Sequence, residues 1–185
     1  HKTITSSEKL RYLQLLSREM QSKFGIKPLE GEAQDQWVRS QLPDQTKSKQ
    51  FQKWFKDSKV VDKKGQPRVV YHGTAANFHA FNKGTKGSGG AIYFSDNPND
   101  ASVFATDAAD GGGDNVLPVY LSIQNPKIIN ARGYLFDDEM QLNIARAARK
   151  AKKSGHDGLV IEGIRNFYDS QLSTTYMVFS PEQAK

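Results

Sequence analysis

A histidine and a glycine, His72 and Gly73, stand at the end of an apolar run over residues 69–71. Because glycine has no side chain, a flat ligand could approach the main-chain amide and carbonyl groups here directly. The His72 imidazole could at the same time donate a hydrogen bond to a ribose hydroxyl beside it. A histidine at the end of a strand is also a common structural residue, so further residues are needed to define a site.

Tyr93 is a second candidate, because it follows the glycine-rich residues 89–90 and precedes an expected helix start at Pro98. An aromatic ring that enters from such a loop can stack on a planar heterocycle. Phe104, on the expected helix, could close the opposite side. Each ring could instead belong to the core, but together with His72 the two rings form an ordered set that suits a nucleotide.

Several other chemistries lack the residues that they need. The chain has no cysteine, which excludes a disulfide framework, a thiolate metal site and a cysteine nucleophile. The glycine-rich residues 83–88 lack the strand and helix that flank a phosphate-binding loop, and no serine has the spacing of a nucleophile elbow. We expect no metal site, since zinc-ligand spacing is missing from the histidines, which are His1, His72, His79 and His156.

The composition describes a polar globule of 185 residues, with 37% hydrophobic residues and a mean hydropathy of −0.66. The chain is long enough to bury a core, and no apolar stretch has the length that spans a bilayer, so we expect no membrane contact. Because it begins with His1 and no signal-like run follows, we expect it to be part of a larger polypeptide.

The net charge of +6 could attract nucleic acid or an acidic partner, although the charges are scattered along the chain. One cluster is denser than the rest and falls on an expected helix. It could be a solvated helix face, or a patch for RNA or an acidic protein. Its members are Arg146, Arg149, Lys150, Lys152 and Lys153.

The elements that must position the candidate residues fall into two parts. Residues 1–58 have apolar residues at helical spacing and predict a bundle of about three helices. An aromatic stripe of this kind is typical of a packing surface. The expected helices are residues 6–24, a segment ending at Pro43, and a segment that carries Phe51, Trp54 and Phe55.

From Lys59 onward the sequence changes to short, β-branched segments separated by glycine-rich loops. Two helices are expected between the strands, over residues 99–106 and 138–154. Short strands with few helices between them predict an α+β fold, so we divide the chain into domains at 1–58 and 59–185. Strands are expected at residues 60–62, 69–72, 92–94, 116–123, 128–129, 159–161 and 176–179.

Three motifs in order resemble the His-Tyr-Glu class of ADP-ribosyltransferases, which includes diphtheria toxin and the poly(ADP-ribose) polymerases. They are Tyr71-His72-Gly73-Thr74, Ala91-Ile92-Tyr93-Phe94-Ser95-Asp96 and the stretch Tyr176 to Gln183. Residues 59–74 are also similar to the transferase modules of phage and mobile-element polyvalent proteins. The resemblance covers residues 59–185 and implies a split β-sandwich, in which two apposed small sheets form a cleft for NAD. The N-terminal helices would be an extension of this domain.

The resemblance implies a role for each motif residue. His72 would bind the adenine-side ribose, and the backbone of Gly73 would hold the nicotinamide carboxamide. Tyr93 would stack on the nicotinamide ring, with Phe104 at its other face, and the loop over residues 82–90 would cover the dinucleotide. The implied NAD-binding residues are Tyr71, His72, Gly73, Thr74, Tyr93 and Phe104.

The chain departs from the family pattern at Thr175, directly before Tyr176, where the family has a glutamate. A threonine can bind a ribose hydroxyl but has no charge, and losing a charged catalytic contact costs on the order of 100-fold in rate. The domain could work without this glutamate, could bind NAD or ADP-ribose without turnover, or could use another acid. By sequence the nearest acids are Glu162 and Glu182, although Glu182 also fits a helix start after Pro181.

The function implied by the resemblance is mono-ADP-ribosyl transfer from NAD to a protein or nucleic-acid acceptor. His72, Tyr93 and Thr175 would form the catalytic set, with Glu162 as a possible substitute acid. The chain would act as a toxin or effector of a phage or mobile element, in the cytoplasm and delivered into a target or host cell. The alternative is a catalytically inactive module that binds NAD or ADP-ribose.

Overall fold

A computed structural model describes the chain over residues 45–74, 81–84, 88–107, 115–136, 138–166 and 171–185. The two expected helices before residue 44 lie outside these residues, as do His1 and His79. The described helices are η1 (Gln45–Lys47), α3 (Lys49–Phe55), α4 (Pro98–Asp107), α5 (Asp138–Lys153) and η2 (Pro181–Gln183). The described strands are β1 (Val70–Thr74), β2 (Ile92–Ser95), β3 (Asn115–Val119), β4 (Pro126–Asn130), β5 (Gly158–Ile164) and β6 (Ser173–Val178).

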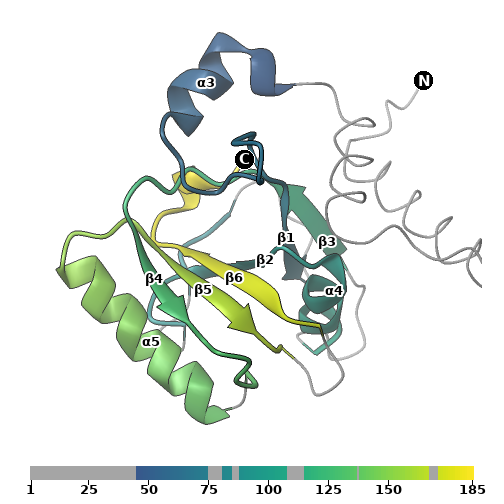
Figure 1. Ribbon diagram of the computed structural model, residues 1–185, viewed down its shortest axis with the longest axis vertical. Coiled ribbons are helices and arrows are strands. Elements are labelled where there is room, and N and C mark those ends of the chain that lie inside the picture. The colour runs from purple at the N-terminus through teal and green to yellow at the C-terminus, as the bar shows by residue number, and fades with distance from the viewer. Residues whose placement is uncertain (1–44, 75–80, 85–87, 108–114, 137, 167–170) are drawn as a thin grey trace, which may run out of the picture.

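The six strands form one mixed sheet in the order β3-β1-β2-β6-β5-β4 (Figure 1). Neighbouring strands are antiparallel except for the parallel pair β4 and β5. Within the described residues, β1 pairs with β2 at Tyr71 and Ser95, whereas β2 pairs with β6 over its whole length. The predicted α+β fold is confirmed, with two groups of strands that meet at this short junction in place of two separate sheets.

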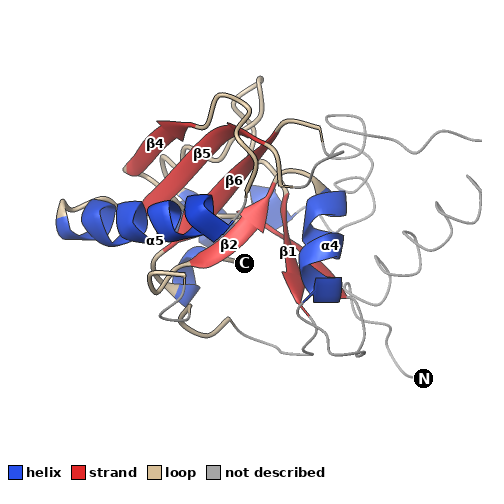
Figure 2. Cartoon of the chain, turned by 90° about the horizontal axis from the view of Figure 1, so that it is seen from below, coloured by secondary structure: helices blue, strands red, loops and turns tan. Residues whose placement is uncertain are grey.

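The helices α4 and α5 cover the same face of this sheet. Figure 2 shows α4 beside β1 and α5 running across β5 and β6. α4 lies so close to β1 that a Cβ atom on Gly73 would meet the backbone of Ala101. α5 packs Ile144 and Ala148 against Leu159 of β5 and Met177 of β6. The part of the face over β2 and β6 therefore lies between two helices.

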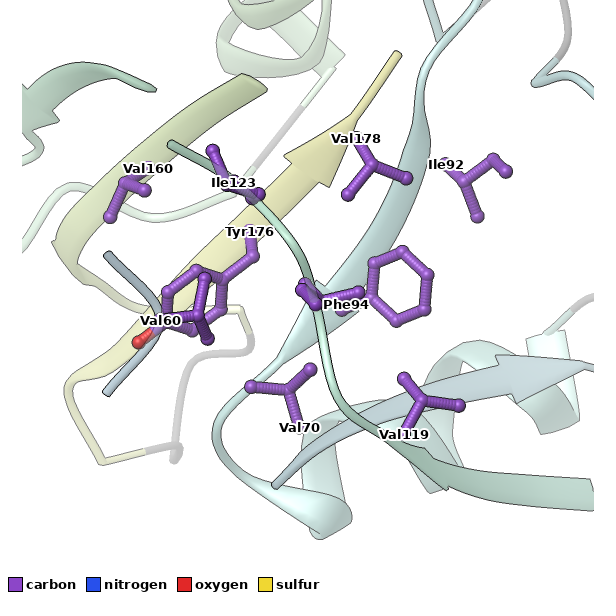
Figure 3. Packing of buried hydrophobic residues seen from close by; sticks show 10 residues of the cluster. Val60, Val70, Ile92, Phe94, Val119, Ile123, Val160, Tyr176 and Val178 are labelled. Atoms are coloured by element: carbon purple, nitrogen blue, oxygen red, sulfur yellow. The ribbon is translucent and has the colours of Figure 1, made fainter. Parts of the chain in front are cut away.

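The opposite face of the sheet buries a second hydrophobic cluster. Phe94, Tyr176 and Val160 from three adjacent strands pack there with Val60, Val119 and Ile123 (Figure 3). Successive residues of a strand point to opposite faces, so Tyr93 and Phe94 lie on different sides of the sheet. This alternation decides which candidate residues can meet.

The third expected helix is confirmed as α3, which packs directly on the core of the sheet. Its Phe51 and Phe55 rings stack with centroids 5.4 Å apart, and Phe51 also meets Tyr120 edge-to-face at 5.1 Å. The Trp54 Nε1–H donates a hydrogen bond to the Glu182 carbonyl at 2.8 Å. α3 therefore shares a hydrophobic cluster with residues of the sheet.

Two expected strands are shorter than predicted. The segment over residues 60–62 forms an isolated bridge, between Val61 and Pro67, because Asp62 closes a tight turn there. Its Oδ1 accepts hydrogen bonds from the backbone amides of Lys64 and Gln66, each at 2.9 Å. The strand expected over 116–123 ends at Val119. The helices expected at 99–106 and 138–154 correspond to α4 and α5.

Candidate functional site

His72 is held in one orientation by the backbone of the neighbouring strand. Its Nδ1 lies 2.8 Å from the Tyr93 carbonyl oxygen. Because a carbonyl only accepts, Nδ1 carries the proton in this hydrogen bond. Burial lowers the pKa of His72 below 6.5, so the ring is neutral at pH 7 and Nε2 is its acceptor nitrogen. The ring also meets Phe81 at 5.2 Å and Phe94 at 5.3 Å, so the His72 side chain lies with Phe94 on the face of the sheet opposite to the Tyr93 side chain.

Tyr93 and Thr175 bring two hydroxyl groups to the helix-covered face of the sheet. Thr175 pairs with Ser95 and Tyr93 pairs with Met177, so Tyr93 and Thr175 are diagonal neighbours, about 7–8 Å apart. Their Oη and Oγ1 atoms are buried and have no hydrogen-bond partner among the described residues. Burial raises the pKa of Tyr93 to about 12, so its hydroxyl keeps its proton. Each unpaired buried hydroxyl costs about 1–3 kcal/mol, and a ligand that bonded to it would recover this cost.

Tyr93 and Phe104 belong to one aromatic group, which a third ring joins. Phe136 lies edge-to-face on Tyr93 at 6.3 Å and on Phe104 at 5.7 Å. Its own position is held by a hydrogen bond from its amide to the Arg165 carbonyl at 2.7 Å. Sequence reasoning missed Phe136, because it stands in a loop between β4 and α5 with no motif around it.

The close packing of α4 on β1 requires a glycine at position 73, whether or not a ligand binds there. A Cβ atom at this position would lie 1.7 Å from the Ala101 carbonyl oxygen and 3.0 Å from the Ala105 nitrogen. One side of the glycine is therefore filled by the α4 backbone. The neighbouring Tyr71 is buried in the cluster around α3, and Thr74 ends β1 opposite Asn115.

The two acids suggested as substitutes for the glutamate are not brought to Thr175. Glu162 is exposed and pairs with Thr174, so it points to the opposite face from Thr175. Glu182 is exposed in η2, where its carbonyl meets Trp54 of α3. A hydrogen bond from the Ser180 hydroxyl lowers the pKa of Glu182, which is consistent with a local role at this helix start.

A different acid, Asp100, lies beside the position of the glutamate. It is 1% exposed, and its Oδ2 accepts hydrogen bonds from Ser95 Oγ at 3.0 Å and Asn166 Nδ2 at 2.6 Å. Ser95 is the cross-strand partner of Thr175. An acid in the first turn of a helix is a common partner of the helix dipole, so the sequence does not distinguish Asp100 from a structural residue.

Asp96 fastens the ends of β2 and β6 next to this group. Its backbone amide donates to the Thr174 carbonyl at 3.1 Å, and its Oδ1 accepts from the Thr174 amide at 2.8 Å. Its Oδ2 forms an ion pair with Arg68 at 3.1 Å. Burial raises the pKa of Asp96, and the Arg68 charge opposes this shift. These contacts hold the neighbouring Thr175 in register.

A sequence model of the family described as "ADP-Ribosyltransferase in polyvalent proteins" matches residues 62–185. The chain belongs to this family of ADP-ribosyltransferases. The family uses NAD as its substrate. A search of curated proteins finds no match.

In the described part of this ADP-ribosyltransferase chain, no cluster of three or more His, Asp or Glu side chains could hold a metal ion. None of the described helices combines the length and the apolar character needed to cross a membrane. The NAD cleft and the contacts of the individual site residues stay predictions.

The change Tyr93→Phe removes the unpaired hydroxyl. It should lower the affinity for NAD without lowering the stability of the ligand-free chain. We expect the ligand-free transferase to keep its stability or gain up to about 1 kcal/mol, because a buried group without a partner is lost. NAD affinity should fall by about 3- to 10-fold, because one neutral hydrogen bond to the ligand is lost. Urea unfolding and calorimetric titration measure the two effects. Tyr134→Phe, at an exposed tyrosine, is the control, and a clear loss of ligand-free stability in Tyr93→Phe would contradict the expectation.

The stability of the transferase should fall as the pH is lowered through 6.5. Burial lowers the pKa of His72 in the folded chain, so the unfolded chain takes up the proton first and is favoured below pH 6.5. Asp96 acts in the opposite sense nearer its own pKa, because burial raises that pKa and the folded chain takes up its proton first. Urea unfolding across this range, for the wild type and for His72→Gln, isolates the histidine. An equal loss of stability in both proteins would rule out His72 as the cause.

Proposed function

We propose that this domain transfers a single ADP-ribose unit from NAD to a macromolecular acceptor. One observation carries the proposal: two buried hydroxyls without partners, on Tyr93 and Thr175, lie on one face of the sheet beside an aromatic group. NAD supplies what these residues lack, since its riboses carry hydroxyls and its nicotinamide is a planar ring. The family match over residues 62–185 supports NAD as the substrate.

The site residues divide the substrate between them in this proposal. His72 accepts a hydrogen bond from the adenine-side ribose through Nε2, while Nδ1–H stays on the Tyr93 carbonyl. The main chain of Gly73 binds the nicotinamide carboxamide, and Thr74 contacts the adenosine. Tyr93 and Phe104 enclose the nicotinamide ring. Thr175 binds a hydroxyl of the nicotinamide-side ribose.

The reaction breaks the bond between C1′ of this ribose and the nicotinamide nitrogen. The electron pair of that bond leaves with nicotinamide, which becomes neutral, and positive charge develops on the sugar. An oxygen or nitrogen of the acceptor then bonds to C1′ and loses its proton to solvent. Because Thr175 has no carboxylate to activate a further ribose hydroxyl, the proposal is for one transfer and not for a polymer.

The domain acts as an effector or toxin in this proposal, in the cytoplasm of a target or host cell. A family found in polyvalent proteins supports a module that works as one part of a longer polypeptide. The acceptor is a protein or a nucleic acid. We retain 59–185 as the transferase domain and 1–58 as a helical extension, with α3 packed on the domain.

The test uses NAD labelled separately in the adenylate and in the nicotinamide, incubated with the purified chain and cell lysate. We expect the adenylate label to become fixed to macromolecules while an equal amount of nicotinamide is released. Tyr93→Ala should lose both signals, whereas Tyr134→Ala, at an exposed tyrosine, should keep them. Release of nicotinamide without fixed label would show hydrolysis of NAD and contradict transfer to an acceptor.

A second function is favoured by the missing charge at Thr175. A domain without a carboxylate at the reacting sugar could bind NAD or ADP-ribose and act only through its contacts with partners. In that case NAD would raise the melting temperature of the chain, but no lysate would yield nicotinamide above the level without protein.

A further inference from the structure

We propose that Asp100 supplies the negative charge that the family's glutamate would supply at the position of Thr175. The inference rests on the proposed transfer reaction. Asp100 acts through the Ser95 hydroxyl and the Asn166 amide that donate to it and does not touch the substrate, so it is a positioning residue. It stabilises the positive charge that develops on the ribose when the bond to nicotinamide breaks.

Asp100 has the hydrogen bonds of a charged carboxylate. It is 1% exposed, and both of its hydrogen bonds within the described chain go to Oδ2, from Ser95 Oγ and Asn166 Nδ2. An acceptor of two donors, one of them at 2.6 Å, is typical of an ionised carboxylate. No lysine or arginine of the described residues forms an ion pair with it. A buried charge without a cation costs folding free energy, which the dipole of α4 offsets only in part.

The hydroxyls around Asp100 border Thr175 on two sides. Ser95 is the cross-strand partner of Thr175, and the Cβ atoms of such partners lie about 4.5–5.5 Å apart. Ser173 lies two residues before Thr175 on the same face of β6, and its Oγ accepts from Asn166 Nδ2 at 2.9 Å. The residue that donates its hydroxyl to the Asp100 carboxylate is therefore the direct cross-strand neighbour of position 175.

Two unpaired polar atoms mark this group as incomplete. Thr175 is 4% exposed and Asn166 is 3% exposed, yet Thr175 Oγ1 and Asn166 Oδ1 have no partner in the described chain. The Asn166 amide is oriented by its Nδ2 bonds to Asp100 and Ser173, so its Oδ1 remains an acceptor. A ribose hydroxyl that reached this place would meet two unpaired atoms, and the one on Asn166 belongs to the network that contains the carboxylate.

A structural role for Asp100 is the competing explanation, because the same bonds attach α4 to β2 and to the end of β5. Asp100→Asn distinguishes the two roles. The amide oxygen of asparagine can accept both hydrogen bonds that Oδ2 accepts, so the anchor of α4 is kept while the charge is lost. Asp157→Asn is a control for loss of an acid at the opposite end of β5, where Asp157 accepts one backbone hydrogen bond at each oxygen, at 2.7 and 2.8 Å. Because asparagine can keep only one of these two bonds, this control should lose stability but leave kcat unchanged.

The experiment compares nicotinamide release by the wild type, Asp100→Asn, Thr175→Glu and the double variant. We expect Asp100→Asn to lower kcat by about 100-fold and to leave KM for NAD within about threefold. Thr175→Glu should restore most of the rate in the Asp100→Asn background, because it places a carboxylate directly at the ribose. In the wild-type background the same change should help little, because two carboxylates would then lie side by side. A structural anchor would show no such rescue.

The outcomes separate this inference from the proposed function. An active wild type together with a fully active Asp100→Asn overturns the inference alone. The inference also fails if the wild type binds NAD without turnover and only Thr175→Glu is active. In that case Asp100 would not supply the charge that the reaction needs. Inactivity of all four proteins overturns the transfer reaction itself. If Asp100→Asn fails to fold, Ser95→Ala removes one hydroxyl between the charge and Thr175 and should lower kcat by about 10-fold with KM unchanged.

Discussion

Replacing His72 with alanine should lower nicotinamide release by about 100-fold and weaken NAD binding. The change removes the acceptor nitrogen proposed for the ribose. It also leaves the Tyr93 carbonyl without the donor that now lies 2.8 Å away, at a cost of about 1–3 kcal/mol in stability. Steady-state release of nicotinamide and calorimetric binding of NAD measure the two effects on function.

A second histidine of the chain provides the control for this change. His156 also places its Nδ1 against a backbone carbonyl, that of Asn125 at 3.2 Å, but it lies in the loop before β5. His156→Ala should leave nicotinamide release unchanged. His72→Gln keeps a side-chain N–H for the Tyr93 carbonyl, and it should regain stability more than activity. Equal activity of His72→Ala and wild type would remove His72 from the site.

Replacing Gly73 with alanine should lower the stability of the domain by about 3 kcal/mol or more and abolish NAD binding. The new Cβ would lie 1.7 Å from the Ala101 carbonyl oxygen and 2.7 Å from its carbon. Both are backbone atoms of α4, so no side-chain rotation can relieve the overlap. α4 would have to move away from β1, taking Asp100 and Phe104 with it. Urea unfolding and NAD titration provide the measurements.

Gly65→Ala is the control for Gly73→Ala, because it replaces a glycine at a position where the new Cβ atom meets no other atom. Gly65 has φ of +75° and nothing lies within 4 Å of its Cβ position. Gly65→Ala should therefore cost only about 1–2 kcal/mol, from the left-handed backbone, and should leave NAD binding intact. A Gly73→Ala protein as stable as Gly65→Ala would mean that α4 can shift at little cost.

The strands and helices after Lys59 could be predicted because each has a local cause. Short β-branched runs and the apolar spacing of α4 and α5 are properties of neighbouring residues. The structure confirms the elements that they predict, except that residues 60–62 form only a bridge and the strand expected over 116–123 ends at Val119. The family could be predicted for a related reason, since its motifs keep their order along the chain, and the family match over residues 62–185 confirms it.

The acids at the site could not be predicted, because they depend on register. Glu162 is close to the expected position in sequence, but a strand residue one place from Ile161 points to the opposite face. Asp100 is 75 residues before Thr175 and approaches it only through the pairing of β2 with β6. The link between Tyr93 and Phe104 through Phe136 likewise depends on a loop that local sequence does not specify.

Between β1 and β2 the structure describes one pair of residues in backbone register, Tyr71 and Ser95. α4 therefore provides a second connection between the strands β3 and β1 and the strands β2, β6, β5 and β4. It rests on Gly73 of β1 and bonds through Asp100 to Ser95 of β2. We therefore expect amides of β1 and β3 to exchange with solvent through openings that leave β2, β6, β5 and β4 folded. A dinucleotide bound to both His72 and Tyr93 would bridge this junction. Binding of the dinucleotide should therefore slow the hydrogen exchange of amides in β1 and β3.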